Sequence, residues 1–348
     1  MRRSRRIFVI ADFKDDEPKS IHVQARMWVK GLLRLGHDVQ RFSYRNVLVQ
    51  CNPFCRRHAR HIPSFVRKRT DRILTEQVKA YNPDVIFIFA MKYLTADTVH
   101  RIKEIAPEAT IVGRDEDPYP EKNPARLAIA KNVDIMTSTN AGRFLKIYKD
   151  MGIPLCAFIP NTCDPDIQYR YPLEEKWKTD IVFTGKVKHK KLEGKNDLFR
   201  YEIVNGLGSM PNARVYGDFG IPRVEGLDYF HAISGAKISL SINIANNVRL
   251  YHSDRLINYL SCGTFVLAKR VPNSDLLFED GVHLRYFDSV EEFFELADWY
   301  LKHDQEREKI AAAGMERAHR EFNCEKIAEC LLDLVENGTY ETPWACIL

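Results

Sequence analysis

The segment 246–255 has the residue types and spacing of a site for a phosphate and a sugar. Ser253 is a good N-cap, because its hydroxyl can accept a hydrogen bond from the free N–H groups of a first helical turn. Asp254 suits the positive end of that helix. A helix N-terminus with an arginine, Arg255, in its first turn predicts a cradle for a diphosphate. The alternative for this arginine is a salt bridge to a neighbour such as Asp254 or Asp275.

A strand–helix–strand unit must position this segment. Ile238–Ile244 and Phe265–Ala268 are apolar runs typical of strands, and Gly263 fits the positive φ that follows a helix. The connection should be right-handed. The loop before the helix, which carries Tyr251, then lies at the carboxyl edge of the sheet, where open α/β sheets bind ligands.

Polar side chains also follow apolar runs in the first half. Asp12 and Asn140 each end such a run, and the loop 114–119 holds Asp115 and Asp117. A carboxylate at this edge can take a proton from an acceptor hydroxyl or orient it. The alternative is an Asx turn before the proline at position 118.

His22 lies near Asp12 at the start of the first predicted helix, 21–35, where a lone histidine serves either an acceptor or the local structure. There is no G-x-G-x-x-G, which argues against a nicotinamide or flavin enzyme. The eight cysteines form no Cys-x-x-Cys pair and are expected to be reduced. We expect no metal and no cofactor.

Strand and helix alternate along the whole sequence, which predicts an α/β protein with parallel sheets covered on both faces. A chain of 348 residues favours two domains. The predicted boundaries are 1–165, 175–325 and a C-terminal helix and tail over 326–348. If the carboxyl edges of two such sheets face each other, they enclose an interdomain pocket.

The first seventy residues are basic, with 17 Lys and Arg against 5 Asp and Glu. This charge is either a solvated surface or an attraction to an anionic membrane or a polyanionic acceptor. The basic runs have few interleaved aromatic residues, so we expect no nucleic-acid partner. No run reaches the roughly 18–20 apolar residues of a membrane span, and MRRSRR runs directly into a strand-like segment instead of a signal peptide.

The second half resembles the donor-binding half of GT-B glycosyltransferases, in their CgeB-like or "glycosyl transferases group 1" branch. The resemblance is carried by Ser253, Arg255, Ile257, Asn258 and Gly263, by the run LLFEDG over 276–281, and by the run 306–322. It implies two Rossmann-like domains facing a cleft, and a final helix that crosses back to the first domain. The reduced cysteines predict a cytoplasmic protein, and the basic first seventy residues predict a peripheral position at the membrane if they contact it. We expect such an enzyme to act in polysaccharide biosynthesis.

The resemblance implies roles for particular residues. Gly185 and Lys186 would approach the donor phosphates, and Arg200 and Arg255 would stabilise charge on the leaving phosphate. Tyr251 and Asn258 would hold nucleoside or sugar hydroxyls, with Ser253 beside them. Relatives usually have Glu where this chain has Asn258, which leaves the donor class open.

The implied reaction is transfer of a sugar from a nucleotide-sugar to a glycan, a lipid-linked molecule or another acceptor, without a metal and with retention of configuration. Asp117, Asp115 and Asp12 are the catalytic candidates, with His22 and Asn140 on the acceptor side. Two alternatives remain: a GT-B nucleotide-sugar epimerase, and a non-catalytic GT-B scaffold. The scaffold would bind no nucleotide.

Overall fold

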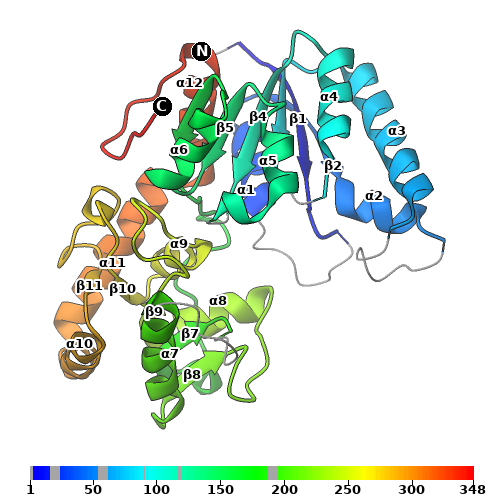
Figure 1. Cartoon of the computed structure of the whole chain (residues 1–348). Helices are drawn as coiled ribbons and strands as arrows, with labels where there is room; N and C mark the ends of the chain where they lie inside the picture. Colours follow the sequence, from blue (N-terminus) through cyan, green and yellow to red (C-terminus); the bar gives the residue numbers. More distant parts are fainter. Residues whose placement is uncertain are drawn as a thin grey trace. The chain divides into compact units, whose positions relative to one another are not determined.

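The computed structural model describes residues 3–15, 24–53, 62–89, 91, 93–116, 119–186 and 195–348, with side chains from residue 198 onward in the last range. Contacts divide the chain into two compact units (Figure 1). Unit 1 comprises residues 1–159 and 324–348, and unit 2 comprises residues 160–323. Each unit is built on one parallel sheet, so the predicted α/β class is confirmed.

The sheet of unit 1 has six parallel strands in the order β2-β1-β3-β4-β5-β6. Apart from the edge strand β2, which is mostly exposed, their residues are almost all buried, as expected of strands covered on both faces. The strands are β1 (Arg6–Ala11), β2 (Asp38–Ser43), β3 (Val85–Ile88), β4 (Thr110–Asp115), β5 (Ile135–Ser138) and β6 (Leu155–Phe158).

The helices of unit 1 cover the two faces of this sheet. The chain moves from β1 to β2 in one direction and from β2 through β6 in the other, so right-handed crossovers place the helix after β1 opposite the later helices (Figure 1). The helices are α1 (Gln24–Arg34), α2 (Tyr44–Cys51), α3 (Ser64–Tyr81), α4 (Ala96–Ile105), η1 (Pro120–Lys122), α5 (Pro124–Ala130), α6 (Arg143–Asp150) and α12 (Cys324–Asn337).

The end of the chain belongs to unit 1. Helix α12 packs against α1, and a Cβ on Gly31 would lie 2.1 Å from the carbonyl oxygen of Cys324, so only glycine permits this close approach. The last residues then pair antiparallel with β6: the N–H of Leu348 donates to the carbonyl of Cys156 at 2.8 Å. This pairing covers the edge strand of the sheet.

The sheet of unit 2 has five parallel strands in the order β11-β10-β9-β7-β8. The strands are β7 (Thr179–Thr184), β8 (Ala213–Tyr216), β9 (Ala236–Ser241), β10 (Phe265–Lys269) and β11 (Arg285–Phe287). The helices are η2 (Glu175–Trp177), α7 (Lys195–Gly208), α8 (Leu227–Ser234), α9 (Asp254–Ser261), η3 (Ser274–Leu276), α10 (Val290–Lys302) and α11 (Asp304–Glu321).

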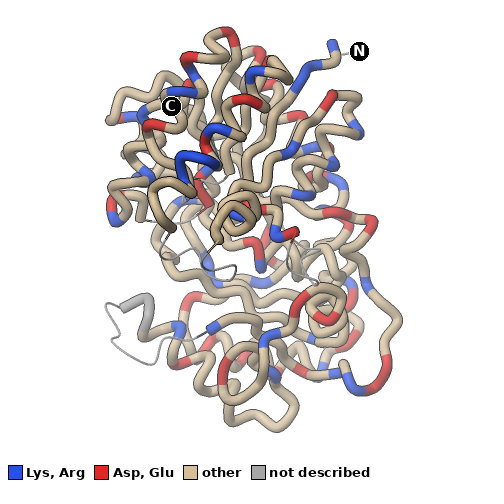
Figure 2. Tube along the Cα trace, turned by 90° about the vertical axis from the view of Figure 1, so that its right-hand side faces the viewer, with Lys and Arg blue, Asp and Glu red and all other residues tan. Residues whose placement is uncertain are grey.

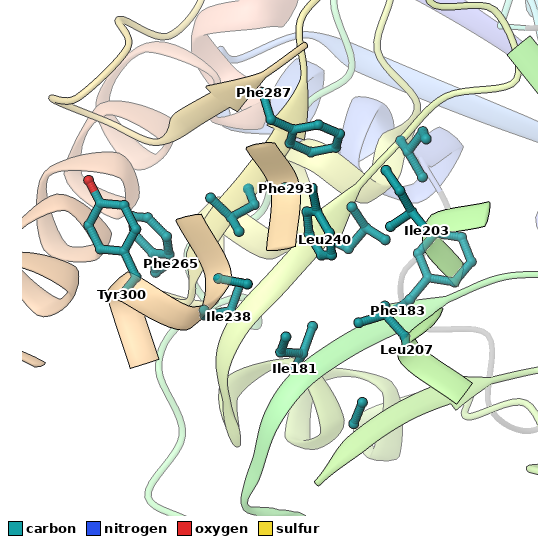
Figure 3. Close-up of a cluster of buried hydrophobic side chains, with 14 of the residues drawn as sticks. Ile181, Phe183, Ile203, Leu207, Ile238, Leu240, Phe265, Phe287, Phe293 and Tyr300 are labelled. Atoms are coloured by element: carbon teal, nitrogen blue, oxygen red, sulfur yellow. The ribbon is translucent and has the colours of Figure 1, made fainter. Parts of the chain in front are cut away.

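One hydrophobic cluster holds unit 2 together (Figure 3). Phe183 of β7, Leu240 of β9 and Phe265 of β10 are buried on the sheet, and Ile203 of α7 and Phe293 of α10 pack against them. Burying side chains of this size is worth roughly 1.5–3 kcal/mol each. The cluster therefore provides a rigid base for the loops at the carboxyl edge of this sheet.

Candidate functional site

The loop after β7 brings main chain and basic side chains together in unit 2. Gly185 has a φ of +148°, a conformation that side chains rarely adopt. A Cβ at this position would lie 3.2 Å from Nη2 of Arg255 and 3.4 Å from Nη2 of Arg200. The absent side chain therefore leaves room for two guanidinium groups that converge on one stretch of main chain.

Arg255, in the first turn of α9, is held by carbonyl groups. Its Nε donates to the carbonyl of Thr184 at 2.8 Å and its Nη1 to the carbonyl of Ile242 at 2.9 Å. Its Cζ lies 4.8 Å from the centre of the Phe183 ring. Within the described part of the chain Arg255 makes no ion pair, so the alternative of a salt bridge to Asp254 or Asp275 is wrong; Asp275 pairs with Arg270. Hydrogen bonds to carbonyl oxygens therefore hold the guanidinium of Arg255 in place, and no carboxylate of the described residues neutralises its charge.

Arg200 of α7 also approaches the ring of Phe183. Its Nη2 donates to the carbonyl of Lys186 at 3.0 Å, and its Cζ lies 5.2 Å from the centre of the Phe183 ring. Lys186 itself is exposed. The structure thus brings together Gly185, Lys186, Arg200 and Arg255, and this pattern of cations at a glycine loop suits a diphosphate.

A buried tyrosine fixes the strand end below this loop. The hydroxyl of Tyr259 accepts a hydrogen bond from the N–H of Thr184 at 2.9 Å and also lies 2.9 Å from the Thr184 hydroxyl. Burial raises the pKa of Tyr259, so its hydroxyl stays protonated. Helix α9 therefore holds the end of β7 through both Arg255 and Tyr259.

Asn243, which the sequence analysis did not single out, shapes the loop before α9. Its Nδ2 donates to the carbonyl of Tyr251 at 3.1 Å, and its Oδ1 accepts from the N–H of Ser253 at 3.0 Å. Its own N–H donates to Oδ1 of Asn246 at 3.1 Å. The available signal was an asparagine at the end of a buried apolar run, where an unpaired amide would be costly.

Ser253 takes the N-cap position of α9 but does not cap it in the predicted way. Its side chain makes no capping hydrogen bond, and its buried Oγ has no partner in the described part of the chain. Tyr251 is almost completely buried, with 4% of its surface exposed. The serine hydroxyl can therefore still accept or donate a hydrogen bond.

Asn258 is buried in α9, with 1% of its surface exposed. Its Oδ1 accepts from Nε2 of Gln168 at 2.6 Å, and its Nδ2 donates to the hydroxyl of Tyr229 at 3.4 Å. Gln168 in turn accepts at Oε1 from the N–H of Asp164. The asparagine thus links α9 to the segment around Gln168, which supplies a structural reason for an amide at this position.

Asp115 ends β4 in unit 1 and is also buried. Its Oδ1 accepts from Nη1 of Arg126 at 2.8 Å, and its Oδ2 accepts from the hydroxyl of Tyr148. Burial raises the pKa of Tyr148, so this hydroxyl remains a donor. Both carboxylate oxygens are therefore used within the fold.

The other residues predicted in unit 1 have different settings. Asp12 is half-buried and accepts at Oδ2 from the hydroxyl of Tyr93 at 3.1 Å. Asn140 is fully buried; its Nδ2 donates to the Ser138 hydroxyl at 3.3 Å, and its Oδ1 has no partner within the described residues. Asp117 and His22 lie outside the residues that the structure describes, so their predicted roles stay predictions.

The described residues contain no group of three or more His, Cys, Asp or Glu side chains arranged to hold a metal ion. None of their helices is long and apolar enough to cross a membrane.

This chain is similar to known proteins over part of its sequence and over nearly its whole fold. Residues 200–333 match the family model described as glycosyl transferase-like, whereas no curated protein matches the sequence. HepE from Anabaena, solved with UDP and glucose, is 12% identical with a TM-score of 0.62, over 95% of this chain and 99% of HepE. An alpha-glucosyltransferase solved with UDP and a 13-mer DNA is 10% identical with a TM-score of 0.63, over 95% and 99% of the two chains. Sucrose-phosphate synthase from Thermosynechococcus elongatus is 14% identical with a TM-score of 0.58, over 96% and 98%.

Two Rossmann-like units and the likeness to these structures define the GT-B fold. More particularly, the match to the glycosyl transferase-like family model covers α8 to α11, most of α7 and much of α12. The predicted resemblance to GT-B glycosyltransferases is confirmed, because the fold is GT-B and residues 200–333 match the glycosyl transferase-like model. These matches are compatible with its CgeB-like branch.

Proposed function

We propose that this protein transfers a sugar from a nucleotide-sugar donor to a glycan, a lipid-linked molecule or another acceptor. The observation that carries the proposal is the convergence of Arg200 and Arg255 on Gly185, at the carboxyl edge of the unit 2 sheet. Both arginines belong to the region that matches the glycosyl transferase-like family. Fixed cations are what the departure of a nucleoside diphosphate requires, because negative charge grows on the leaving phosphate.

The donor diphosphate would contact three groups of this site. Nη2 of Arg255 has no hydrogen-bond partner in the described residues and lies beside Gly185, so it can donate to a phosphate oxygen. The positive end of α9 and the exposed Lys186 add to the same field. We propose the Ser253 hydroxyl as a further donor contact, and a supporting role for Tyr251 and Asn258 through their buried positions.

UDP-sugars are the first donors to test. HepE was solved with UDP-glucose as well as with UDP and glucose, and the alpha-glucosyltransferase was solved with UDP. The cationic site would supply leaving-group stabilisation without a metal. We propose that transfer is metal-independent, needs no cofactor and retains the anomeric configuration.

The acceptor side is assigned to unit 1. Asp117 remains the catalytic candidate, because both carboxylate oxygens of Asp115 already accept hydrogen bonds, from Arg126 and from Tyr148. Asp12 keeps one partly exposed carboxylate at the end of β1. His22 and Asn140 are the acceptor-side contacts of the proposal.

An epimerase is the alternative that shares the fold. A putative UDP-N-acetylglucosamine 2-epimerase from Listeria monocytogenes is 11% identical with a TM-score of 0.54. The match to the glycosyl transferase-like family favours transfer. Release of nucleoside diphosphate that requires an acceptor supports transfer, whereas conversion of the sugar without any acceptor supports epimerisation.

The place of action that we propose is the cytoplasmic side of an anionic membrane, in polysaccharide biosynthesis. The excess of Lys and Arg in the first seventy residues supports it, because clustered basic residues are attracted to anionic lipids.

Arg255→Gln tests the donor site. Loss of a charge-assisted hydrogen bond costs roughly 1.5–3 kcal/mol, so UDP affinity should fall by about tenfold to a hundredfold in calorimetric titration. Arg214→Gln is the matched control, because Arg214 also donates to two carbonyls of unit 2 but stands exposed on β8. Equal UDP affinity in a folded Arg255→Gln protein and in the control would remove Arg255 from the donor site.

A further inference from the structure

A stack of three aromatic rings runs from the core of unit 2 to its surface. Phe230 of α8 is completely buried, Tyr171 is half-buried, and Tyr169 has 41% of its surface exposed. The centre of the Tyr171 ring lies 4.1 Å from that of Tyr169 and 6.5 Å from that of Phe230, with interplanar angles of 23° and 4°. Among the described residues, Tyr171 is the one ring that contacts Tyr169, so the stack ends at a ring that is exposed to solvent.

Polar contacts hold the two outer rings in place. The hydroxyl of Tyr171 donates to the carbonyl of Ile167 at 2.8 Å, and the hydroxyl of Ser234 donates to the carbonyl of Tyr169 at 3.3 Å. His231 meets the edge of the Tyr171 ring, with the ring centres 5.1 Å apart and the planes at 75°. A ring that is fixed in this way loses little conformational freedom when a ligand stacks on it, and this favours binding.

This surface lies at the amino edge of the unit 2 sheet. Ser234 ends α8 just before β9, and Trp177 ends η2 just before β7. A Cβ on Gly235 would lie 2.2 Å from the carbonyl oxygen of Trp177, so these two segments are in direct contact. The donor site at Gly185 and Arg255 lies at the opposite, carboxyl edge of the same sheet. The exposed ring therefore belongs to a second surface of unit 2.

The charges beside the exposed ring balance each other. Figure 2 shows Lys and Arg interspersed with Asp and Glu along the chain. Every charged side chain of residues 169–178 forms an ion pair: Arg170 with Glu308, Lys176 with Glu174 at 2.9 Å, and Lys178 with Glu175 at 2.7 Å. This segment therefore offers no unpaired charge to a phosphate or an anionic surface. Its exposed ring suits an uncharged ligand.

We propose that Tyr169 is a stacking site for a sugar ring of an uncharged acceptor glycan. The phenol ring of tyrosine has an apolar face and a polar edge. A pyranose ring has the matching form, because its C–H groups make an apolar face and its hydroxyl groups surround it. A planar aromatic partner would also stack here, but a glycan is the ligand that the proposed reaction brings to this protein. The inference rests on the proposed function, selects a glycan among the proposed acceptors and adds a second place that holds it.

Affinity electrophoresis with matched variants tests this site. Native gels contain dextran, glucomannan or galactan, and the retardation of the protein measures its affinity for each uncharged polysaccharide. At least one of the three should retard wild type. On that polysaccharide Tyr169→Leu should bind roughly threefold to tenfold more weakly, because a stacked ring contributes about this much. Tyr169→Phe keeps the ring and should bind like wild type.

Trp299→Leu is the control for the loss of an exposed ring. Trp299 is 42% exposed and belongs to α10, where it stacks on His303 with the ring centres 3.8 Å apart. This variant should bind like wild type. An equal loss in Trp299→Leu, or retardation of wild type by none of the three polysaccharides, would overturn the proposal. Stronger retardation by the anionic polygalacturonate than by all three would also overturn it, because binding would then follow charge.

Sedimentation velocity and UDP titration separate the remaining outcomes. If wild type were a dimer and Tyr169→Leu a monomer, the ring would lie between two copies of the chain, and the glycan site would be discarded. UDP affinity should be unchanged in Tyr169→Leu, because the donor site lies at the other edge of the sheet. Arg255→Gln should show the reverse, with weaker UDP binding and normal retardation. Loss of the polysaccharide result alone would therefore reject this inference without touching the proposed transfer reaction.

Discussion

The carboxyl edges of the two sheets hold charged residues in opposite ways. In unit 2, Arg255 is held by hydrogen bonds to the carbonyls of Thr184 and Ile242. Among the described residues, no carboxylate forms an ion pair with it. In unit 1, Asp115 and Arg126 neutralise each other in a buried pair. Hydrogen bonds to carbonyl groups orient a cation without neutralising its charge. In a buried ion pair, the two charges neutralise each other. The first arrangement can recognise a ligand, and the second stabilises a fold.

The largest expected effect comes from breaking the buried pair. Asp115→Ala leaves Arg126 without its carboxylate and Tyr148 without its acceptor, in a place where both partners of the ion pair are less than a tenth exposed. Removing one member of a buried pair costs about 3–5 kcal/mol. Urea unfolding should show this loss.

Asp150→Ala is the control for this substitution. Asp150 pairs with Lys146 on α6, the helix that also carries Tyr148, but its side chain is 59% exposed. The control should lose less than about 1 kcal/mol. If both variants were equally stable, the buried pair would not be structural and Asp115 would again be a candidate for catalysis.

The second effect concerns the loop that follows this pair. Asp117→Asn should reduce transfer by at least about a hundredfold while UDP affinity barely changes, because a positioned general base contributes roughly 10²–10⁴-fold. Glu121→Gln, an exposed carboxylate of η1, is the control and should transfer at the wild-type rate. Normal turnover in Asp117→Asn would mean that Asp117 has no catalytic role and only shapes the turn before the proline.

The secondary structure and part of the site could be predicted from the sequence. Apolar runs and helix signals are local, so the alternation of strands and helices, the start of α9 and the position of Arg255 could all be predicted. Helix α2 was not predicted, because Tyr44–Cys51 carries no clear cap and follows β2 without a turn.

Partners that are distant in the sequence were the ones missed. Asp115 meets Arg126 and Tyr148, which are 11 and 33 positions away. Arg255 reaches Thr184 across 71 positions, and Asn258 reaches Gln168 across 90. Local patterns indicate which residues carry charge at a sheet edge, and only the fold decides whether that charge is paired.

The smallest expected effect tests the space between the two arginines. Gly185→Ala would place a Cβ 3.2 Å from Nη2 of Arg255 and 3.4 Å from Nη2 of Arg200, at a φ that disfavours alanine. The guanidinium groups must shift by a few tenths of an ångström, and UDP affinity should fall several-fold, less than in Arg255→Gln. The strained backbone should also cost roughly 1–3 kcal/mol of stability.

Gly220→Ala separates crowding from backbone strain. Gly220 has a φ of +75° and no heavy atom within 4 Å of the new Cβ, so this variant should lose stability and keep its UDP affinity. Calorimetric titration and urea unfolding of both alanine variants give the two quantities independently. Unchanged UDP affinity in Gly185→Ala would mean that the diphosphate does not bind between the two arginines. The difference between the two sheet edges would then concern the stability of the fold and not ligand binding.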